Sequence, residues 1–122
     1  MKNRDIVKII ICSNNKELAK QFEIAIKKES KYFTEETYII NEIDEIFDAN
    51  ILIRVIESNN QRVLNQNELD IIKNKIDNFI TVDLKEYIVI EENNENKFTK
   101  NEGMRAMAFS IIFKYYLKIK NI

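Results

Sequence analysis

The sequence contains no histidine and no proline, and it has a single glycine and a single cysteine. Without histidine the chain cannot build a Ser-His-Asp triad, a Cys-His pair or a histidine-ligated metal site. One glycine cannot supply a glycine-rich loop of the kind that cradles phosphate groups. These absences exclude most of the chemistries that a sequence can reveal. We therefore expect no catalytic residue, no cofactor and no dedicated metal site.

Charge of one sign is also lacking, because 19 basic and 20 acidic residues leave a net charge of -1. Such a chain has no overall field that draws it to nucleic acid or to anionic lipid. Lysines near the C-terminus and the pair Tyr115 and Tyr116 fit contacts with phosphates and bases, but the apolar residues between them argue against that interpretation. No stretch approaches the roughly 18 to 20 apolar residues of a membrane span. The sequence predicts neither a nucleic-acid nor a membrane partner.

The lone Cys12 cannot form a disulfide within the chain. The N-terminal residues lead into an apolar run that Lys8 interrupts and that is too short for a signal peptide. Both features predict a cytoplasmic protein. The abundance of isoleucine, asparagine and lysine indicates A+T-rich coding, which is typical of a bacterium, phage or plasmid.

The 122 residues have the length of one domain, and the pattern along them predicts alternating strands and helices. Strands are expected at residues 6–12, 37–40, 51–56 and 87–90. Helices are expected at residues 15–30, 67–79 and 100–120, with a short helical turn at 41–48 and Asn14 or Asn15 as the first N-cap. Residues 91–96 are all glutamate or asparagine, and this composition predicts a solvated loop.

This order, β-α-β-(short α)-β-α-β-α, predicts a small three-layer α/β domain over residues 1–122 with a mainly parallel four-stranded sheet. Lys8 and Arg54 lie in the middle of predicted strands, as expected if one sheet face is partly open to water. That feature fits an alternative, a ferredoxin-like split βαββαβ fold with an extra C-terminal helix.

Small polar and acidic residues follow the predicted strands. Ligands of an open parallel sheet bind beyond the carboxyl ends of its strands. The candidate ligand-binding residues at these ends are Ser13, Asn14, Glu57, Asn59 and Glu91. Their carboxylate and amide oxygens suit a hard divalent cation, and Ser13 with Asn14 at a helix start suits an anion. Such residues are also common in ordinary turns.

The segments at residues 49–56, 87–91 and 104–116 resemble those of zinc-dependent N-acetylmuramoyl-L-alanine amidases. In that resemblance Ile56 stands where a zinc-ligating histidine belongs, and Glu91 matches a functional carboxylate. Both zinc histidines are missing from this chain. The resemblance therefore implies a degenerate amidase-like domain without zinc ligands and without hydrolytic activity.

The C-terminal helix is apolar right around its cylinder between residues 106 and 113. A helix on a protein surface shows one apolar stripe, so the other faces need a cover. The residues that we expect outside the stripe facing the sheet are the interface candidates Phe109, Ile112, Phe113 and Tyr116. The cover is a second chain or another element of the same fold.

Together these patterns predict a small non-catalytic protein-interaction module that binds a partner protein or itself, as a homodimer through its C-terminal helix. The alternative is a small-ligand binder or a divalent-metal-dependent phosphate-processing enzyme. That enzyme would use Ser13, Asn14, Glu57 and Glu91 at the strand ends.

Overall fold

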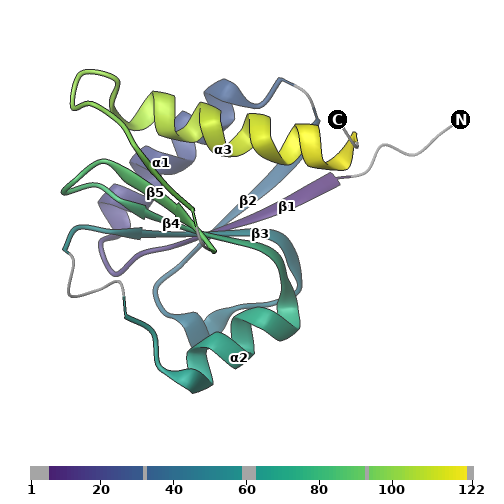
Figure 1. Ribbon diagram of the computed structural model, residues 1–122. Helices are drawn as coiled ribbons and strands as arrows, with labels where there is room; N and C mark the ends of the chain where they lie inside the picture. The colour runs from purple at the N-terminus through teal and green to yellow at the C-terminus, as the bar shows by residue number, and fades with distance from the viewer. Residues whose placement is uncertain (1–5, 32, 59–62, 93, 121–122) are drawn as a thin grey trace, which may run out of the picture.

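The computed structural model describes residues 6–31, 33–58, 63–92 and 94–120. It is an α/β fold with a six-stranded mixed sheet and three helices (Figure 1). The strands are β1 (Ile6–Cys12), β2 (Thr34–Ile40), β3 (Ala49–Ile56), β4 (Ile76–Asp83), β5 (Ile88–Glu91) and β6 (Asn94–Lys97). The helices are α1 (Lys16–Glu29), α2 (Gln66–Lys75) and α3 (Gly103–Ile119), with a short 3-10 turn η1 (Ile43–Glu45).

The strands lie in the order β2-β1-β3-β4-β5-β6. The first four are parallel, whereas β5 and β6 run antiparallel to their neighbours. The parallel pairing of β1 with β3 contradicts the split βαββαβ alternative, in which the third strand points the opposite way. The prediction of a mainly parallel four-stranded sheet is therefore correct only in part, because the sheet has six strands and two of them are antiparallel.

The boundary between α2 and β4 is the largest error of the sequence-based prediction. The helix expected at residues 67–79 ends at Lys75, and Ile76 is both its C-cap and the first residue of β4. The sequence does not indicate where the helix ends and the strand begins, because isoleucine and phenylalanine continue at helical spacing and no glycine or proline separates the two elements. The fourth parallel strand is therefore β4 and not the segment at residues 87–90.

Residues 87–90 belong instead to β5, which forms an antiparallel hairpin with β6. The loop predicted at residues 91–96 is wrong, because β6 begins at Asn94. Its residues are asparagine, glutamate and lysine, which strand propensities do not favour. These residues form a strand because their backbone pairs with that of the apolar β5.

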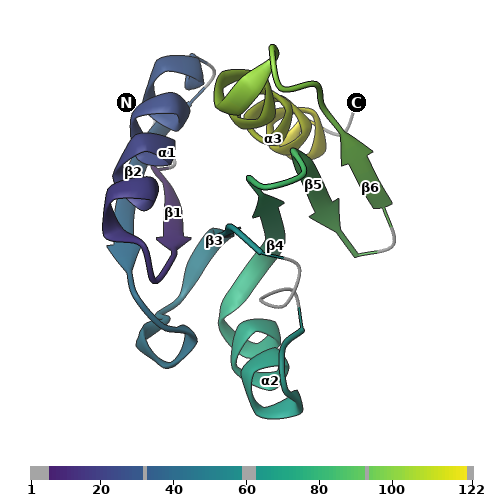
Figure 2. The same ribbon diagram turned by 90° about the vertical axis from the view of Figure 1, so that its left-hand side faces the viewer.

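Side chains alternate between two sheet faces, and each face has its own core. Ile9, Ile11, Ile51 and Ile53 pack with α1 and α3, which lie side by side on one face (Figure 2). Ile10 and Leu52, of the opposite parity, pack with α2 and η1 on the other face. This confirms the three-layer arrangement and explains why β1 and β3 are apolar on both sides.

The layer that contains α2 is incomplete. α2 has 10 residues and packs against β4 and η1, whereas α1 and α3 have 14 and 17 residues. Lys8 is exposed on the α2 side of β1, so the polar mid-strand residue does mark an open part of this face. The predicted partial exposure was correct, although it arises in a three-layer fold.

One edge of β4 is also open in part. Only Thr81, Val82 and Asp83 of β4 pair with β5, whereas β3 pairs with β4 from Ile76 onward. In the described part of the chain, no strand pairs with residues 76–80 on the side away from β3. The sheet therefore splits at Thr81, because residues 76–80 of β4 are not paired with the described residues of the β5–β6 hairpin.

Candidate functional site

The C-terminal helix α3 buries one side and exposes another. Met107, Ala108, Ile111 and Ile112 are buried in the core between the helix and the sheet. Ile112 was an expected interface residue, and this part of the prediction needs correction, since its side chain is 0% exposed. Its side chain belongs to the core cluster that α1, α3 and the sheet share, and the sequence alone does not place α1 beside α3.

The other three candidates form one strip along α3, which we call the outer aromatic face: Phe109, Phe113 and Tyr116. The rings of Phe109 and Phe113 are stacked with centroids 5.6 Å apart, and those of Phe113 and Tyr116 lie 6.5 Å apart. Phe109 is 42% exposed, and the other two are half-buried. The spacing of three and four residues places all three rings along one side of the helix. The face is thus a continuous aromatic surface.

Basic residues border this strip. The ammonium group of Lys120 lies 5.9 Å from the centre of the Tyr116 ring, in the range of a cation–π contact. Arg105 lies at the other end of the helix and forms an ion pair with Glu29 of α1. Between Gly103 and Lys120 the chain contains no aspartate or glutamate. The strip of aromatic rings is therefore bordered by Lys120 at one end and by the ion-paired Arg105 at the other.

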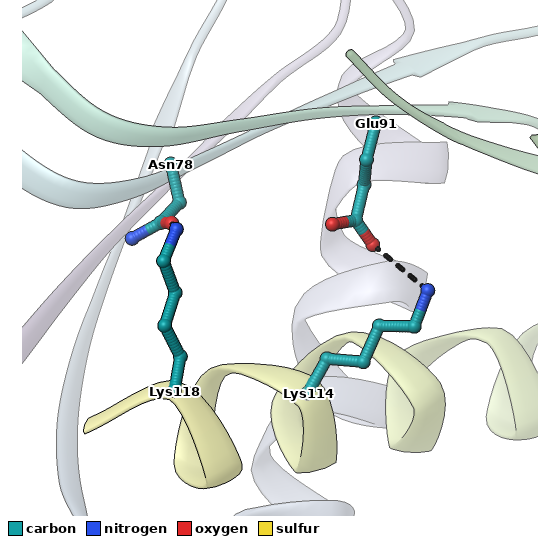
Figure 3. Close-up of polar contacts among 4 residues, drawn as sticks. All are labelled: Asn78, Glu91, Lys114 and Lys118. Atoms are coloured by element: carbon teal, nitrogen blue, oxygen red, sulfur yellow. Dashed lines mark hydrogen bonds and ion pairs between the residues drawn. The ribbon is translucent and has the colours of Figure 1, made fainter. Parts of the chain in front are cut away.

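Two contacts connect α3 with the sheet (Figure 3). Lys114 Nζ lies 3.4 Å from Glu91 Oε1 of β5, and Lys118 Nζ donates a hydrogen bond of 2.5 Å to Asn78 Oδ1 of β4. Both lysines extend from the side of α3 that faces β4 and β5. The buried residues Met107, Ala108, Ile111 and Ile112 orient the helix, and these exposed contacts add little to its orientation.

The strand-end candidates do not converge on one point. Ser13 and Asn14 follow β1, and Glu57 follows β3 on the neighbouring strand. Glu57 Oε2 accepts a hydrogen bond of 3.2 Å from the Asn15 side chain, which also caps α1 through Leu18. Asn15 and not Asn14 is therefore the N-cap. These contacts give Glu57 a structural partner at the start of α1.

Glu91 lies elsewhere, which corrects the expectation that it joins Glu57 at one edge. Ile88 of β5 pairs with Asp83 of β4, and Asp83 pairs with Ile56 of β3. Because β5 runs antiparallel, Glu91 lies three residues from Ile88 in the direction away from the carboxyl ends of β3 and β4. The Cα atoms of Glu57 and Glu91 are therefore about 16 Å apart. A single cation with ligands at about 2.0 to 2.6 Å cannot bind both carboxylates. Asn59 lies outside the described residues.

A cavity of about 470 Å³ does open at the carboxyl ends of β1, β2 and β3. The chain leaves β1 toward one side of the sheet and β3 toward the other, and this switch point is where open α/β sheets bind ligands. Its polar lining includes Ser13, Asn14, Arg54, Asn41, Glu42, Asp44 and Glu68. Ser13 and Asn14 thus line this cavity, whereas Glu57 and Glu91 are not part of it.

Several of these lining residues were missed by the sequence-based reasoning. Asn41, Glu42 and Asp44 follow β2, and the signal for them in the sequence is the polar run after that strand. In the sequence Arg54 is visible only as a charge within an apolar strand. It pairs in register with Cys12 of β1 and Thr81 of β4, and partial burial lowers the pKa of its guanidinium.

Cys12 lies beside Arg54 at the base of this cavity, and its thiol is not poised to react. Burial raises the pKa of the thiol from 9.0 to about 11, while the nearby Arg54 opposes the increase. A thiol is nucleophilic as its thiolate, so this residue is almost entirely protonated at neutral pH. Its position therefore supports a role in packing.

Among the described residues, no group of three or more histidine, cysteine, aspartate or glutamate side chains is arranged to hold a metal ion. No described helix has the length and apolar character needed to cross a membrane. Comparison of the chain with protein-family models, with curated proteins and with solved structures gives no match.

Proposed function

We propose that this chain is a small non-catalytic protein-interaction module of the cytoplasm that associates with itself through the outer aromatic face of α3. The observation that carries the proposal is the stacked strip of Phe109, Phe113 and Tyr116 on the outside of a well-anchored helix. Aromatic residues dominate the energetic centres of protein interfaces. The rings are already ordered by mutual stacking, so docking restricts few additional rotamers.

Sedimentation velocity of the purified protein over a wide concentration range tests this proposal. Phe109→Glu introduces a charge on the exposed part of the face and is expected to abolish association while the protein stays folded. Ile24→Glu is the matched control, since Ile24 is 54% exposed on α1, outside the proposed interface. A wild-type protein that remains a monomer at the highest concentration contradicts self-association. Equal loss in both variants contradicts the assignment to α3.

A second candidate function is small-ligand binding in the cavity of about 470 Å³ at the switch point. Its volume lies in the range of ligand sites, and Arg54 offers a guanidinium for an anionic group. Glu42, Asp44 and Glu68 bring more negative than positive charge to the lining. The lining thus suits a polar molecule with a cationic group better than a multiply charged phosphate.

Thermal unfolding in the presence of inorganic phosphate, of glycine as a simple amino-carboxylate, and of Mg²⁺ or Mn²⁺ tests this candidate. Stabilisation by glycine that Arg54→Met removes supports a site for molecules with both charges. Stabilisation by phosphate together with Mg²⁺ supports the phosphate-processing alternative. No stabilisation by any of these probes contradicts a site for these chemical classes.

A further inference from the structure

The largest cavity among those described, of about 1110 Å³, lies where the sheet divides below Thr81. We call it the β4 notch. Its walls are the open edge of β4, the helix α2 and the tip of the β5–β6 hairpin. Apolar side chains line it: Leu64, Leu69, Ile72, Ile76, Phe79, Ile80 and Ile90. Leu69 is 41% exposed at its rim. Figure 2 shows α2 below β4, and the β5–β6 hairpin above α2 and to the right of β4.

The rim of the notch is acidic. Its charged residues are Asp77, Glu91, Glu92, Glu95, Lys73 and Lys118. Carboxylates outnumber ammonium groups, and Glu91 among them is paired with Lys114 of the same chain. The outer aromatic face of α3 has the opposite character, with arginine and lysine and no carboxylate between Gly103 and Lys120. The notch and the outer aromatic face thus differ in the sign of their charge, and Glu91 and Arg105 already form ion pairs within the chain.

We propose that the β4 notch is the docking site for α3 of a second copy of this chain, so that copies associate head to tail. This inference rests on the proposed self-association and specifies its geometry. Phe109 and Phe113 of one copy enter the notch between α2 and the hairpin of the next, and Lys120 approaches its acidic rim. Desolvation of the rings stabilises the contact, and opposite charges orient it.

Two-fold pairing of α3 with α3 is disfavoured by the same charges. An antiparallel pair centred on the aromatic strip places Phe109 opposite Tyr116 of the partner subunit. At both ends it then places Arg105 opposite Lys120 of the partner subunit, and the ion pair of Arg105 with Glu29 of α1 offsets only part of this repulsion. Like charges brought together in this way oppose association. Head-to-tail docking replaces these repulsions with attractions.

A mixing experiment distinguishes the two geometries. Phe109→Glu places a charge on the docking face of α3 and leaves the notch unchanged. Leu69→Lys places a charge in the notch and leaves α3 unchanged. Each variant alone is expected to sediment as a monomer. An equimolar mixture is expected to form a complex of two chains that does not grow further, because the remaining surfaces of that complex are the altered ones. The wild type, with both surfaces intact, forms rings or longer chains.

Other outcomes separate this inference from the proposed function. If Leu69→Lys associates like the wild type while Phe109→Glu is a monomer, α3 is the interface and the notch is not its partner. If both variants are monomers and their mixture stays monomeric, head-to-tail docking is overturned. Circular dichroism verifies that each variant is folded, and Glu95→Lys, at an exposed rim position, replaces Leu69→Lys if that variant unfolds. A monomeric wild type overturns both proposals.

Discussion

Glu29 Oε2, at the end of α1, lies 3.5 Å from Arg105 Nε, in the first turns of α3. The Glu29 side chain is 9% exposed and that of Arg105 is 76% exposed, so a buried carboxylate is neutralised by a cation that reaches it from solvent. Among the described residues, none donates a hydrogen bond to this oxygen. The ion pair joins the two helices that cover one face of the sheet.

Removing the cation from this pair is expected to destabilise the fold. Arg105→Met leaves the buried carboxylate of Glu29 without its counter-charge and should lower the free energy of unfolding by about 1 to 2 kcal/mol. Solvent around Arg105 keeps the loss below that of a fully buried pair. Urea unfolding measures it. The Glu29→Gln background should tolerate Arg105→Met better, and an equal loss in both backgrounds would show that the two side chains are not coupled.

The buried Cys12 thiol predicts a specific loss of stability at alkaline pH. Its pKa is about 11 in the folded protein and 9.0 as an ordinary thiol, so the folded state retains a proton that the unfolded chain releases. This contribution is complete below pH 9 and is lost as the pH rises toward about 11. Over that interval the wild type should lose about 2 kcal/mol more than Cys12→Ala, as measured by urea unfolding.

The same burial predicts slow reaction of Cys12 with thiol reagents at neutral pH in the native protein. Labelling should accelerate when the protein is unfolded in urea. Rapid stoichiometric labelling of the folded protein, or an alkaline loss of stability unchanged in Cys12→Ala, would contradict the packing role.

Gly103 opens α3 with a φ angle of 66°, a conformation that residues with a side chain rarely adopt. A Cβ atom at this position meets nothing within 4 Å, so the cost of substitution arises from the backbone alone. Gly103→Ala should therefore lower the free energy of unfolding by about 1 kcal/mol. Gly103→Asn should lower it less, because asparagine tolerates this region better. Two variants as stable as the wild type would indicate a different start of the helix.

The two sides of α3 should respond differently to truncation. Ile112→Ala removes a buried side chain and should cost about 2 to 5 kcal/mol of stability. Phe109→Ala loses mainly one exposed ring contact and should cost less than about 1.5 kcal/mol. Conversely, Phe109→Ala should weaken self-association, whereas the conservative Ile112→Val should not. Urea unfolding and sedimentation velocity together test this contrast, which fails if both effects fall on the same residue.

Salt should weaken the association of the wild type. In head-to-tail docking Lys120, at the end of α3, faces the acidic rim of the notch, and added ions screen that attraction. Sedimentation of the wild type at low and high concentrations of sodium chloride measures the effect, with Glu95→Lys expected to show a smaller salt dependence. Association that strengthens with salt would instead indicate contact between like-charged helices.

The sequence predicts the parallel part of this fold well, since the isoleucine runs of β1 and β3 are strongly strand-forming and α1 has a clear cap at Asn15. It predicts β4 poorly, because Ile76 and Phe79 continue the helical spacing of Leu69 and Ile72 across the boundary. Lysines at the end of α2 were the available signal for its stop. Local spacing is ambiguous there, and only pairing with β3 decides the outcome.

The candidate sites depend still more on contacts between distant segments. Ser13 and Asn14 could be placed at a cavity from their position after β1. The separation of Glu91 from Glu57 could not, since it results from the antiparallel direction of β5. The β4 notch likewise arises from a sheet that divides, and its lining comes from five elements, α2, β4, β5, β6 and α3. No periodicity in the sequence predicts such an arrangement.

The open edge of β4 between Ile76 and Ile80 carries a risk for the isolated chain. Backbone donors and acceptors next to apolar side chains are a template for strands of other molecules, and natural proteins usually cover or charge such edges. Asp77 supplies a charge at this edge, yet Phe79 and Ile80 follow it directly. An occupied notch would shield this edge. Dilution or loss of the docking helix would then raise the tendency of the protein to aggregate on heating.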